Sequence, residues 1–547
     1  MHQIFKKPRK DQMNLPQLRA RILLITFAIF LQCECGKKQS EENLPLLRQP
    51  RPGGRLRLAA QSPSSLDPIR SQSYWESAIV LQLFDGLVRL DPSLNIIPAI
   101  AQDWSISPDG RVYQFDLRKG VRFHNGREVD AEDFVYSLSR LLDPREASQD
   151  SYPYLRIRGA DDMRQGKTAV VSGLHATDKY HFEITLEHPY SPFLRLLALQ
   201  PASVVPREEF SLGRNFSKRP VGTGPFFLES WNSESEIRLK ANPDYFGGKP
   251  FLNELQIRTF PALSAKESYQ EYLDGKLDLS FVPPESILEA KKDPNGIYVS
   301  RPVLRFLYLG LNMKDPLMQN PDVRKAIYHA INKKEAVGQD LDYEVTHAIL
   351  PFSLLGSKYS TQSDPYAPEV AKQTLKQLRS KREKNVPLQL WHAYVSDSRT
   401  RLLSKISSDL NAVGFDVELR LVSSMNELLT RIYSGQTQLF LLGEQIDFPD
   451  PDALFDRLFN SKSHGNPFGY HNPVVDRLLM EAQSTLDDEQ RASLYGEIER
   501  IILGDHAILP LACVKYSYIH SRRFKDLDVN VLGFQYLPFR QVWVQTE

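Results

Sequence analysis

The sequence holds one cluster of side chains whose type and spacing could do acid–base chemistry. Asp447, Asp450 and Asp452 share a proline-rich segment directly after the apolar run 439–442. An acidic loop at the end of a strand is a place where α/β proteins hold ligands. Three interpretations are open at this point: the carboxylates cap a helix and form a turn, they capture a cationic group, or they act as general acid and base.

Motifs for other chemistry are missing from the sequence. The chain has no G-x-x-x-x-G-K-[ST] phosphate loop, no H-E-x-x-H metal helix and no G-x-S-x-G nucleophile elbow. Gly222 and Gly224 lack the third glycine of a dinucleotide fingerprint, and Pro225 follows where a helix should begin. His464 and His471 lie seven residues apart without a further metal ligand spaced with them. We therefore expect no metal and no cofactor.

The first 32 residues form a leader that differs from the rest of the chain. Six Lys and Arg residues precede the run 22–31, which is ten residues long and contains no charge. A helix needs about 20 apolar residues to span a bilayer, so this run is too short. A basic segment before a short apolar core is typical of a secretory signal peptide, which we place at residues 1–32. Met13 opens a leader of more usual length, and we expect translation to start there.

Two of the three cysteines directly follow this leader. Cys33 stands where a bacterial lipoprotein signal has its lipidated cysteine, although the usual leucine and small residue are missing before it. We expect acyl chains on Cys33 to hold the protein at a lipid bilayer, with residues 33–53 as a polar linker. A plain signal peptide or a short anchor is the alternative. Cys35 and Cys513 remain as free thiols, too few for a disulfide framework or a four-thiolate zinc site.

Charge patterning excludes nucleic acid as a partner. The 547 residues carry 68 Lys and Arg against 67 Asp and Glu, a formal net charge of +1. Six of the basic residues and one acidic residue lie in the leader, so the rest carries 62 against 66, a net charge of −4. A nucleic-acid binder needs a basic face that displaces phosphate counterions. With 41% hydrophobic and 25% charged residues, the composition is that of an ordinary soluble protein of several domains.

Hydrophobic periodicity predicts a mixed α/β protein. Alternating residues predict strands at 55–60, 113–118, 181–186 and 236–240. A capping-box pattern at 130–133 predicts the start of a helix. Apolar stripes at i, i+4, i+7 and i+8 predict helices that pack on sheets. These stripes are Phe134, Leu138, Leu141 and Leu142; Val323, Ile327, Ala330 and Ile331; and Leu494, Ile498, Ile501 and Ile502.

A series of short motifs runs along the chain in order. They include Ser65-Leu66-Asp67-Pro68, Ser107-Pro108-Asp109-Gly110, His124-Asn125-Gly126, Val221-Gly222-Thr223-Gly224-Pro225-Phe226, Asn242-Pro243-Asp244-Tyr245 and Val323-Arg324-Lys325-Ala326. From about residue 54 to the end, this series resembles the family 5 extracellular solute-binding proteins. The members of that family are the peptide- and nickel-binding components of ABC importers.

The resemblance implies an α/β fold of the two-lobed periplasmic-binding-protein type (type II), with an additional domain inserted in the first lobe and two hinge crossovers. The first lobe comprises 54–92, 205–300 and 514–547, the extra domain 93–204, and the second lobe 301–513. Crossovers near 301–302 and 511–514 join the lobes, and solute binds between them. We assign the aromatic and glycine residues of the motifs, among them Trp104, Gly222 and Gly224, to the fold and not to the solute.

The resemblance also implies a binding site. In the peptide binders of this family, an aspartate four residues after a glycine holds the peptide's α-ammonium group, and Gly443 and Asp447 match that pair. An extended peptide pairs its backbone with the cleft. The ligand-binding residues expected here are Asp447, Gly443, Glu444, Gln445, Ile446, Ser64, Ser65 and Leu66. Glu444 departs from the family pattern, since an acid replaces the usual tryptophan. The run 439–442 offers no arginine for a peptide carboxylate.

The function that the resemblance implies is the substrate-binding component of an ABC importer. Such a protein captures short peptides and delivers them to permease subunits that work with cytoplasmic ATPases. We expect a monomer without catalytic activity, held in the cell envelope by its acyl chains, in the periplasm or at the cell surface. Alternative solutes are a nickel chelate, an oligosaccharide or a small amine. Two further interpretations are a surface adhesin on the same scaffold and a hydrolase that uses Asp447, Asp450 and Asp452.

Overall fold

The computed structural model of the chain describes residues 50–545. Its gaps lie at 72, 147, 212–214, 233–234, 339–341, 352, 361–364, 379–384, 394–395, 447 and 534–535. The predicted signal peptide, Cys33, Cys35 and Asp447 lie outside the described residues. Among the helices that are described, none has the length and apolar content needed to cross a membrane.

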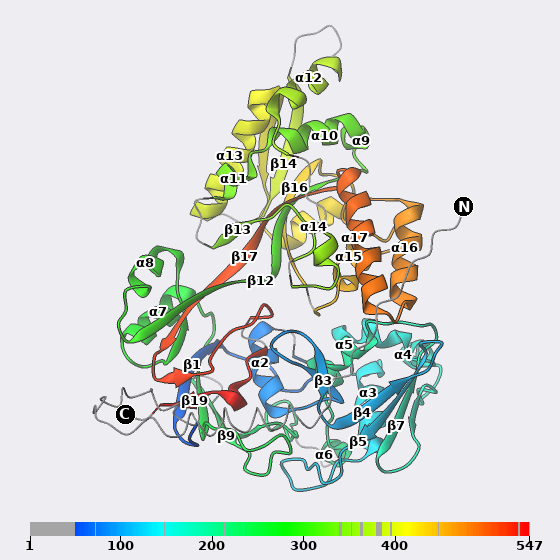
Figure 1. The fold of residues 1–547 in the computed structure, drawn as a ribbon, viewed down its shortest axis with the longest axis vertical. Helices are drawn as coiled ribbons and strands as arrows, with labels where there is room; N and C mark the ends of the chain where they lie inside the picture. The colour runs from blue at the N-terminus through cyan, green and yellow to red at the C-terminus, as the bar shows by residue number, and fades with distance from the viewer. Residues whose placement is uncertain are drawn as a thin grey trace, which may run out of the picture. The chain divides into compact units, whose positions relative to one another are not determined.

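Two long strands connect the two lobes of the fold. β12 (Gly296–Leu311) and β17 (Ile508–Ser521) pair with each other in antiparallel orientation along most of their length. In Figure 1 they run from the lobe that contains β1 and β9 to the lobe that contains β14 and β16. The register of the pair shifts between Pro302 and Phe306, which lie opposite Lys515 and Cys513. This break lies next to 301–302 and 511–514, where the family resemblance implies the crossovers, and their role as hinges stays a prediction.

The first lobe is built on a four-stranded sheet in the order β1 (Arg55–Gln61), β10 (Glu254–Phe260), β9 (Glu236–Ala241) and β8 (Phe226–Asn232). Only the β1–β10 pair in this sheet is parallel. Alternate residues such as Leu56 and Leu58 are buried, and they pack with residues of helix α2 (Tyr74–Leu83). The four predicted strands are all present in the molecule, with ends within one residue of the prediction.

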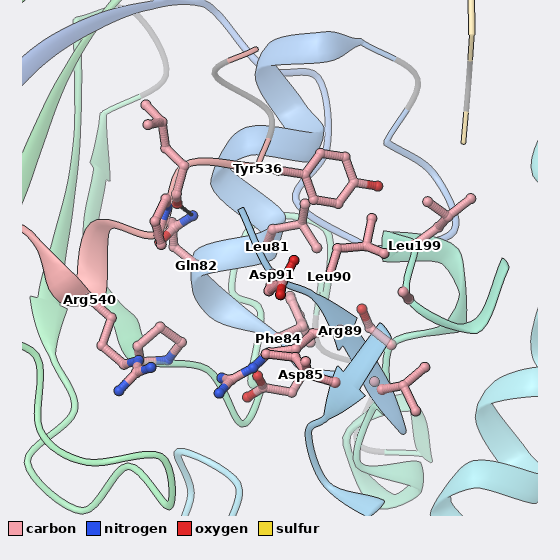
Figure 2. A pocket seen from close by; sticks show the side chains of 18 of the residues that line it. Leu81, Gln82, Phe84, Asp85, Arg89, Leu90, Asp91, Leu199, Tyr536 and Arg540 are labelled. Atoms are coloured by element: carbon pink, nitrogen blue, oxygen red, sulfur yellow. Dashed lines mark hydrogen bonds between the residues drawn. The ribbon is translucent and has the colours of Figure 1, made fainter. Parts of the chain in front are cut away.

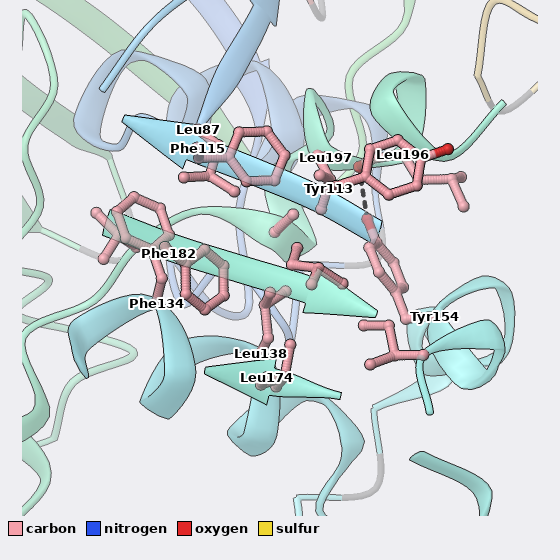
Figure 3. Close-up of a cluster of buried hydrophobic side chains, with 14 of the residues drawn as sticks. Leu87, Tyr113, Phe115, Phe134, Leu138, Tyr154, Leu174, Phe182, Leu196 and Leu197 are labelled. Atoms are coloured by element: carbon pink, nitrogen blue, oxygen red, sulfur yellow. Dashed lines mark hydrogen bonds between the residues drawn. The ribbon is translucent and has the colours of Figure 1, made fainter. Parts of the chain in front are cut away.

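A second four-stranded sheet carries its own core. Its order is β4 (Ala101–Ile106), β5 (Val112–Leu117), β7 (His181–Thr185) and β6 (Leu174–Ala176). Helix α3 (Ala131–Leu142) begins with the predicted capping box, in which Asp130 and Asp133 each accept the other's backbone N–H. Figure 3 shows Phe134 of this helix beside Phe115 and Phe182 of the sheet. Trp104 packs against the same core and stays partly exposed, so its assignment to the fold is confirmed.

The second lobe surrounds the far half of the strand pair with helices on both faces. Strands β16 (Leu439–Gln445), β14 (Val386–His392) and β15 (Phe415–Leu421) extend the sheet from β12. One face packs against α10 (Pro321–Ala330), α12 (Pro368–Leu378) and α13 (Asp397–Val413). The other face packs against α14 (Met425–Tyr433), α15 (Asp452–Phe459), α16 (Pro473–Ser484) and α17 (Asp488–Gly504). Leu494 and Ile501 of the predicted stripe on α17 are only partly buried.

The remaining elements are short. They are β2 (Val88–Leu90), β3 (Ile96–Pro98), α4 (Ala160–Arg164), α5 (Phe193–Leu197), α6 (Arg207–Ser211), α7 (Ala265–Leu273), β11 (Leu279–Phe281), α8 (Ile287–Ala290), α9 (Pro316–Gln319), α11 (Lys333–Val337), β13 (Tyr343–Val345), β18 (Phe524–Lys525) and β19 (Trp543–Val544). Both β11 and β13 pair with β17, so this strand has partners in both lobes.

The glycine motif 222–224 packs against the end of α2. A Cβ on Gly222 would lie 2.0 Å from the carbonyl oxygen of Leu83, and a Cβ on Gly224 would lie 2.5 Å from the carbonyl oxygen of Gln82. Between the two glycines, the hydroxyl of Thr223 accepts the backbone N–H of Asp85 at 3.0 Å. Only glycine permits such a close backbone approach. The motif therefore belongs to the fold, as predicted.

We expect Gly222→Ala to lower the free energy of unfolding by about 2 kcal/mol or more, because the new Cβ overlaps a backbone oxygen that cannot move without shifting α2. The matched control is Gly504→Ala at the end of α17, where a Cβ meets nothing within 4 Å. That change is expected to stabilise the protein by up to about 1 kcal/mol through helix propensity. Urea unfolding of both variants measures the difference, and equal stabilities would contradict the close packing.

Candidate functional site

The end of strand β16 forms an open face of the sheet. Leu439 and Leu441 are buried under the helices that cover this face. Gly443 and Gln445 continue the same face, because successive side chains of a strand alternate, but both residues are exposed. On the neighbouring strand β12, Arg305 is the partner of Gln445 and is exposed as well. The covering helices thus leave this part of the sheet open, at the position where the sequence predicts the solute.

Gly443 leaves space over the sheet that the protein itself does not need. The atoms nearest to a Cβ placed on it are Phe306 O at 3.7 Å, and Arg305 Nε and Leu307 Cδ1 at 3.9 Å, which are ordinary contacts. Its backbone is not left-handed either. Neither backbone strain nor close packing therefore requires a glycine here, in contrast to Gly222. A missing side chain in a strand is typical of a site where another backbone approaches closely.

The backbone of β16 also has an unpaired edge. Strand β14 pairs with β16 only at Leu439 and Phe440. Beyond Phe440, no strand in the described part of the chain pairs with that edge, while the opposite edge stays bonded to β12 as far as Gln445. Ile446 then turns into the core and donates its N–H to Leu304 O at 2.9 Å. Leu441 and Leu442 are buried, so 443–445 is the part of this edge that can offer backbone groups to an extended ligand, as far as the described residues go.

Glu444 points away from the open face. It lies between Gly443 and Gln445, so its side chain is on the opposite side of the strand. There its carboxylate forms an ion pair with Arg457 of α15. The charge that replaces the family's tryptophan is thereby neutralised inside the second lobe, and the open face receives only the backbone of Glu444.

The predicted segment 64–66 is held by helix α2. Glu76 Oε1 accepts the backbone N–H of Ser64 at 2.6 Å and that of Ser65 at 3.2 Å. Leu66 donates its N–H to Ser217 O at 3.0 Å. No described hydrogen bond joins this segment to β16. The role of this segment in binding solute stays a prediction. Any bond from the segment to the solute would have to come from groups other than these three N–H donors.

Two of the three carboxylates of the acidic loop, Asp450 and Asp452, are bound by other side chains of the protein. Asp450 Oδ1 accepts Arg491 Nη2 at 2.8 Å, and both side chains are 0% exposed. Asp450 also accepts the backbone N–H of Asp452 at 3.0 Å, in the first turn of α15. Of the three interpretations of this loop, the structure supports turn formation and the capture of a cation for Asp450, and the cation is the protein's own Arg491.

Asp452 connects the second lobe to the segment before α5. Tyr190 donates its hydroxyl to Asp452 Oδ2 at 2.6 Å, and Gln483 Nε2 donates to Oδ1 at 2.9 Å. Beside them, Ser191 donates its N–H to the carbonyl oxygen of Gln483 at 2.8 Å. Burial raises the pKa of Asp452 to about 6, and the nearby charge of Asp456 adds to the increase. The bonds from Tyr190 and Gln483 lower it in part.

The raised pKa makes the stability of the fold depend on pH. A carboxyl group with a folded pKa of about 6 and an ordinary value of 3.8 stabilises the fold below pH 4 and loses that contribution as the pH rises through 6. Between pH 4 and 7, the wild-type protein is expected to lose about 2 kcal/mol of unfolding free energy through this group. Asp452→Asn removes the titration. Urea unfolding at both pH values measures the difference, and identical pH dependence of the two proteins would contradict this assignment.

A hollow of about 420 Å³ lies beside the break in the strand pair. Five aromatic residues from four segments line it: Tyr74 and Trp75, Phe281, Tyr343, and Tyr516. Phe281 meets the rings of Trp75 and Tyr516 edge to face, with centroids 5.6 Å apart in each case. The sequence did not indicate these residues, because no two of the four segments are neighbours along the chain. An aromatic hollow at the connection of the lobes suits an apolar side chain of a solute.

A smaller cavity of about 150 Å³ is lined by residues of the first lobe and by residues of the segment 93–204, among them Ile97 and Leu199. In Figure 2, Asp85 and Arg540 lie on the side of this cavity away from Tyr536. Tyr245 donates its hydroxyl to Asp85 at 2.8 Å, and Arg89 donates to the same hydroxyl at 3.3 Å. Burial raises the pKa of Asp85. These bonds join the motif 242–245 to the segment that follows α2. The motif therefore has a structural role in the fold.

A metal site or a reactive thiol could serve a binding site, but the described residues provide neither. Among the described residues, no group of three His, Cys, Asp or Glu side chains is arranged to hold a metal ion. Cys513 is a buried free thiol on β17. Burial raises its pKa to about 11, which keeps it protonated and poorly reactive at neutral pH.

The two lobes, their paired connecting strands and the open end of β16 together define a solute-binding protein of the two-lobed type II fold. The family model described as "Bacterial extracellular solute-binding proteins, family 5 Middle" matches residues 95–466, more than half of the chain. The chain belongs to this family, and the family predicted from the motifs is confirmed.

Several known proteins are similar over most of their length. Di/tripeptide-binding protein 2 of Pseudomonas aeruginosa (strain UCBPP-PA14) is 29% identical over 504 residues, which cover 87% of this chain and 91% of that protein. Heme-binding protein A of Haemophilus influenzae is 28% identical over 508 residues, 88% of this chain and 89% of that protein. The solved structure of the ABC transporter-associated protein DppA from Helicobacter pylori, in complex with the peptide STSA, is 26% identical, with a TM-score of 0.71 and coverage of 91% and 99%.

Proposed function

We propose that this chain is the substrate-binding component of an ABC importer, which captures short peptides between its two lobes and delivers them to the membrane permease. The observation that carries this proposal is the open face and free edge of β16 at Gly443. The peptide-binding relatives and the peptide complex of DppA support it.

The physical basis of capture is strand-like pairing of the peptide backbone. An extended peptide satisfies its own N–H and C=O groups on the edge of β16 at 443–445, which gives affinity with little dependence on sequence. Asp447 pairs with the peptide's α-ammonium through charge-assisted hydrogen bonds, which are strong in a closed cleft. The aromatic hollow at Phe281 takes a side chain of the peptide.

We further propose the domain boundaries named above: a first lobe of 54–92, 205–300 and 514–547, an inserted domain of 93–204 and a second lobe of 301–513. The break in register between Pro302 and Phe306 supports a hinge at the lobe boundary. Pro302 cannot donate a backbone hydrogen bond, so the ladder is weakest there. Closure of the lobes about this hinge produces the form that the permease recognises.

The protein is proposed to act as a monomer and to perform no chemistry. The burial of Asp450 and Asp452 supports the second point, since two of the three carboxylates that a hydrolase would use are engaged by the protein's own side chains. For the cell envelope, we propose an anchor of acyl chains on Cys33, in the periplasm or at the cell surface. Among other solutes, heme is supported by the similarity to heme-binding protein A.

Protein purified without denaturation is expected to carry short peptides, which native mass spectrometry detects directly. Gly443→Val is expected to weaken peptide binding at least 10-fold, because the side chain fills the space over β16. Its unfolding free energy should change by less than about 1 kcal/mol, since the new Cβ makes only ordinary contacts. Calorimetric titration with trialanine measures the affinity. A co-purified heme or sugar in place of peptide would overturn the proposed solute.

The amine anchor is tested in the same titration. Asp447→Ala is expected to weaken binding of trialanine by a factor of about 100 or more, as truncation of one partner of a buried charge pair does. N-acetylation of the peptide removes the ammonium group and should cost the wild-type protein a similar factor. Equal affinity of the wild-type protein for acetylated and free peptide would remove Asp447 from this role and leave peptide binding itself in place.

The lipid anchor is tested by Cys33→Ala. The wild-type protein is expected to sediment with membranes, because two or more acyl chains bind a bilayer stably at about 0.8 kcal/mol per buried methylene. The variant is expected to appear in the soluble envelope fraction. Cys513→Ala is the matched control and should not change the distribution. Sedimentation of the Cys33→Ala protein with membranes would contradict lipidation at this residue.

A further inference from the structure

The cavity of about 150 Å³ has two arginine side chains on its wall, Arg89 and Arg540. Both lie beside Tyr245. Arg89 Nη1 donates to the hydroxyl of Tyr245 at 3.3 Å, and the guanidinium carbon of Arg540 is 5.9 Å from the centre of the tyrosine ring. In Figure 2, both arginines lie on the same side of the cavity as Asp85. Two like charges therefore meet at one end of a small cavity.

A single carboxylate faces this pair of arginines. Asp85 is buried, and its oxygens accept the hydroxyls of Tyr245 at 2.8 Å and of Thr223 at 3.3 Å. Burial raises the pKa of Asp85, and the charges of Arg89 and Arg540 offset only part of that increase. Burial lowers the pKa of Arg540, and the charge of Arg89 adds to the decrease. One poorly solvated carboxylate against two guanidinium groups leaves an excess of positive charge, which an anion would balance.

The other carboxylate of the cavity wall, Asp91, is bound by its own turn. Its Oδ1 accepts the backbone N–H groups of Ser93 and Asn95, each at 2.8 Å, and its Oδ2 accepts Asn95 Nδ2 at 3.0 Å. Among the ion pairs of the described residues, none joins Asp91 to Arg89 or Arg540. The excess of positive charge at the arginine end therefore remains.

The rest of the cavity wall consists mainly of apolar side chains, among them Phe84, Leu90 and Leu199. An apolar cavity of this volume accommodates a molecule as large as benzene. Leu90 and Tyr536 also pack against the core of the second lobe, and Leu199 packs against the core that surrounds the second four-stranded sheet. The cavity thus lies where the two lobes and the segment 93–204 meet.

We propose that this cavity is a second binding site, which takes a small organic anion with its carboxylate at Arg89 and Arg540 and its apolar body against Phe84 and Leu199. A guanidinium group matches a carboxylate with two parallel hydrogen bonds. Among the described residues, none that lines this cavity belongs to β16 or lines the aromatic hollow at Phe281. The site is therefore separate from the peptide site and does not depend on the proposed function.

The test is a calorimetric titration of the full chain with benzoate and with benzamide, in the presence and absence of trialanine. Benzoate is expected to bind more tightly than benzamide by a factor of about 10 or more, because only benzoate carries the charge. Arg540→Gln is expected to lose this preference. Leu199→Trp retains both arginines, fills the apolar part and should weaken benzoate binding by a similar factor. Arg420→Gln, which removes an exposed arginine from β15, is the matched control and should preserve the preference.

The possible outcomes each decide one part of the inference. Equal binding of benzoate and benzamide, or unchanged benzoate affinity in Arg540→Gln, overturns the site. Competition between benzoate and trialanine overturns its separation from the peptide site. Inorganic phosphate that binds more tightly than benzoate overturns the apolar part of the ligand. Thermal unfolding shows whether each variant is folded, and if Arg540→Gln is not, the comparison of Leu199→Trp with the wild-type protein decides.

Discussion

The antiparallel ladder between β12 and β17 carries backbone hydrogen bonds from one lobe into the other. At about 3.3 Å per residue, the 16 residues of β12 reach about 50 Å, enough to take part in the sheets of both lobes. The near half of the pair binds β11 and the far half binds β16. Because the register of β12 against β16 decides which side chains share a face, this ladder places Arg305 beside Gln445 and above Gly443. A slip of one residue would turn the side chain of Arg305 to the face opposite to that of Gln445.

The local rules of sequence predict much of the scaffold. The helix 131–142 begins at its capping box, and all four residues of its apolar stripe are buried, because both signals depend only on neighbouring residues. The glycine motif 222–224 was assigned correctly to the fold for a similar reason: a glycine–threonine–glycine sequence needs a tight backbone approach, and α2 provides it. The strands of the second lobe were harder, since 439–442 is buried on both faces and shows no alternation.

The candidate site required information that the sequence contains only over long separations. Whether Asp450 and Asp452 face a solute or the interior depends on Arg491 and Tyr190, which lie far along the chain in either direction. The same holds for Glu444, whose charge is neutralised by Arg457 of α15. An acid in place of tryptophan therefore does not by itself define a new pocket. Gly443 was found from its spacing to Asp447, but Arg305 belongs to a strand with no motif of its own.

The contact between Tyr190 and Asp452, together with the bond from Ser191 to Gln483, has a mechanical consequence. The proposed hinge at the strand pair is one point about which the lobes would turn, and this contact is a second point at which two distant segments are held together. Two fixed points define a line, so any rotation that preserves both contacts has its axis along that line.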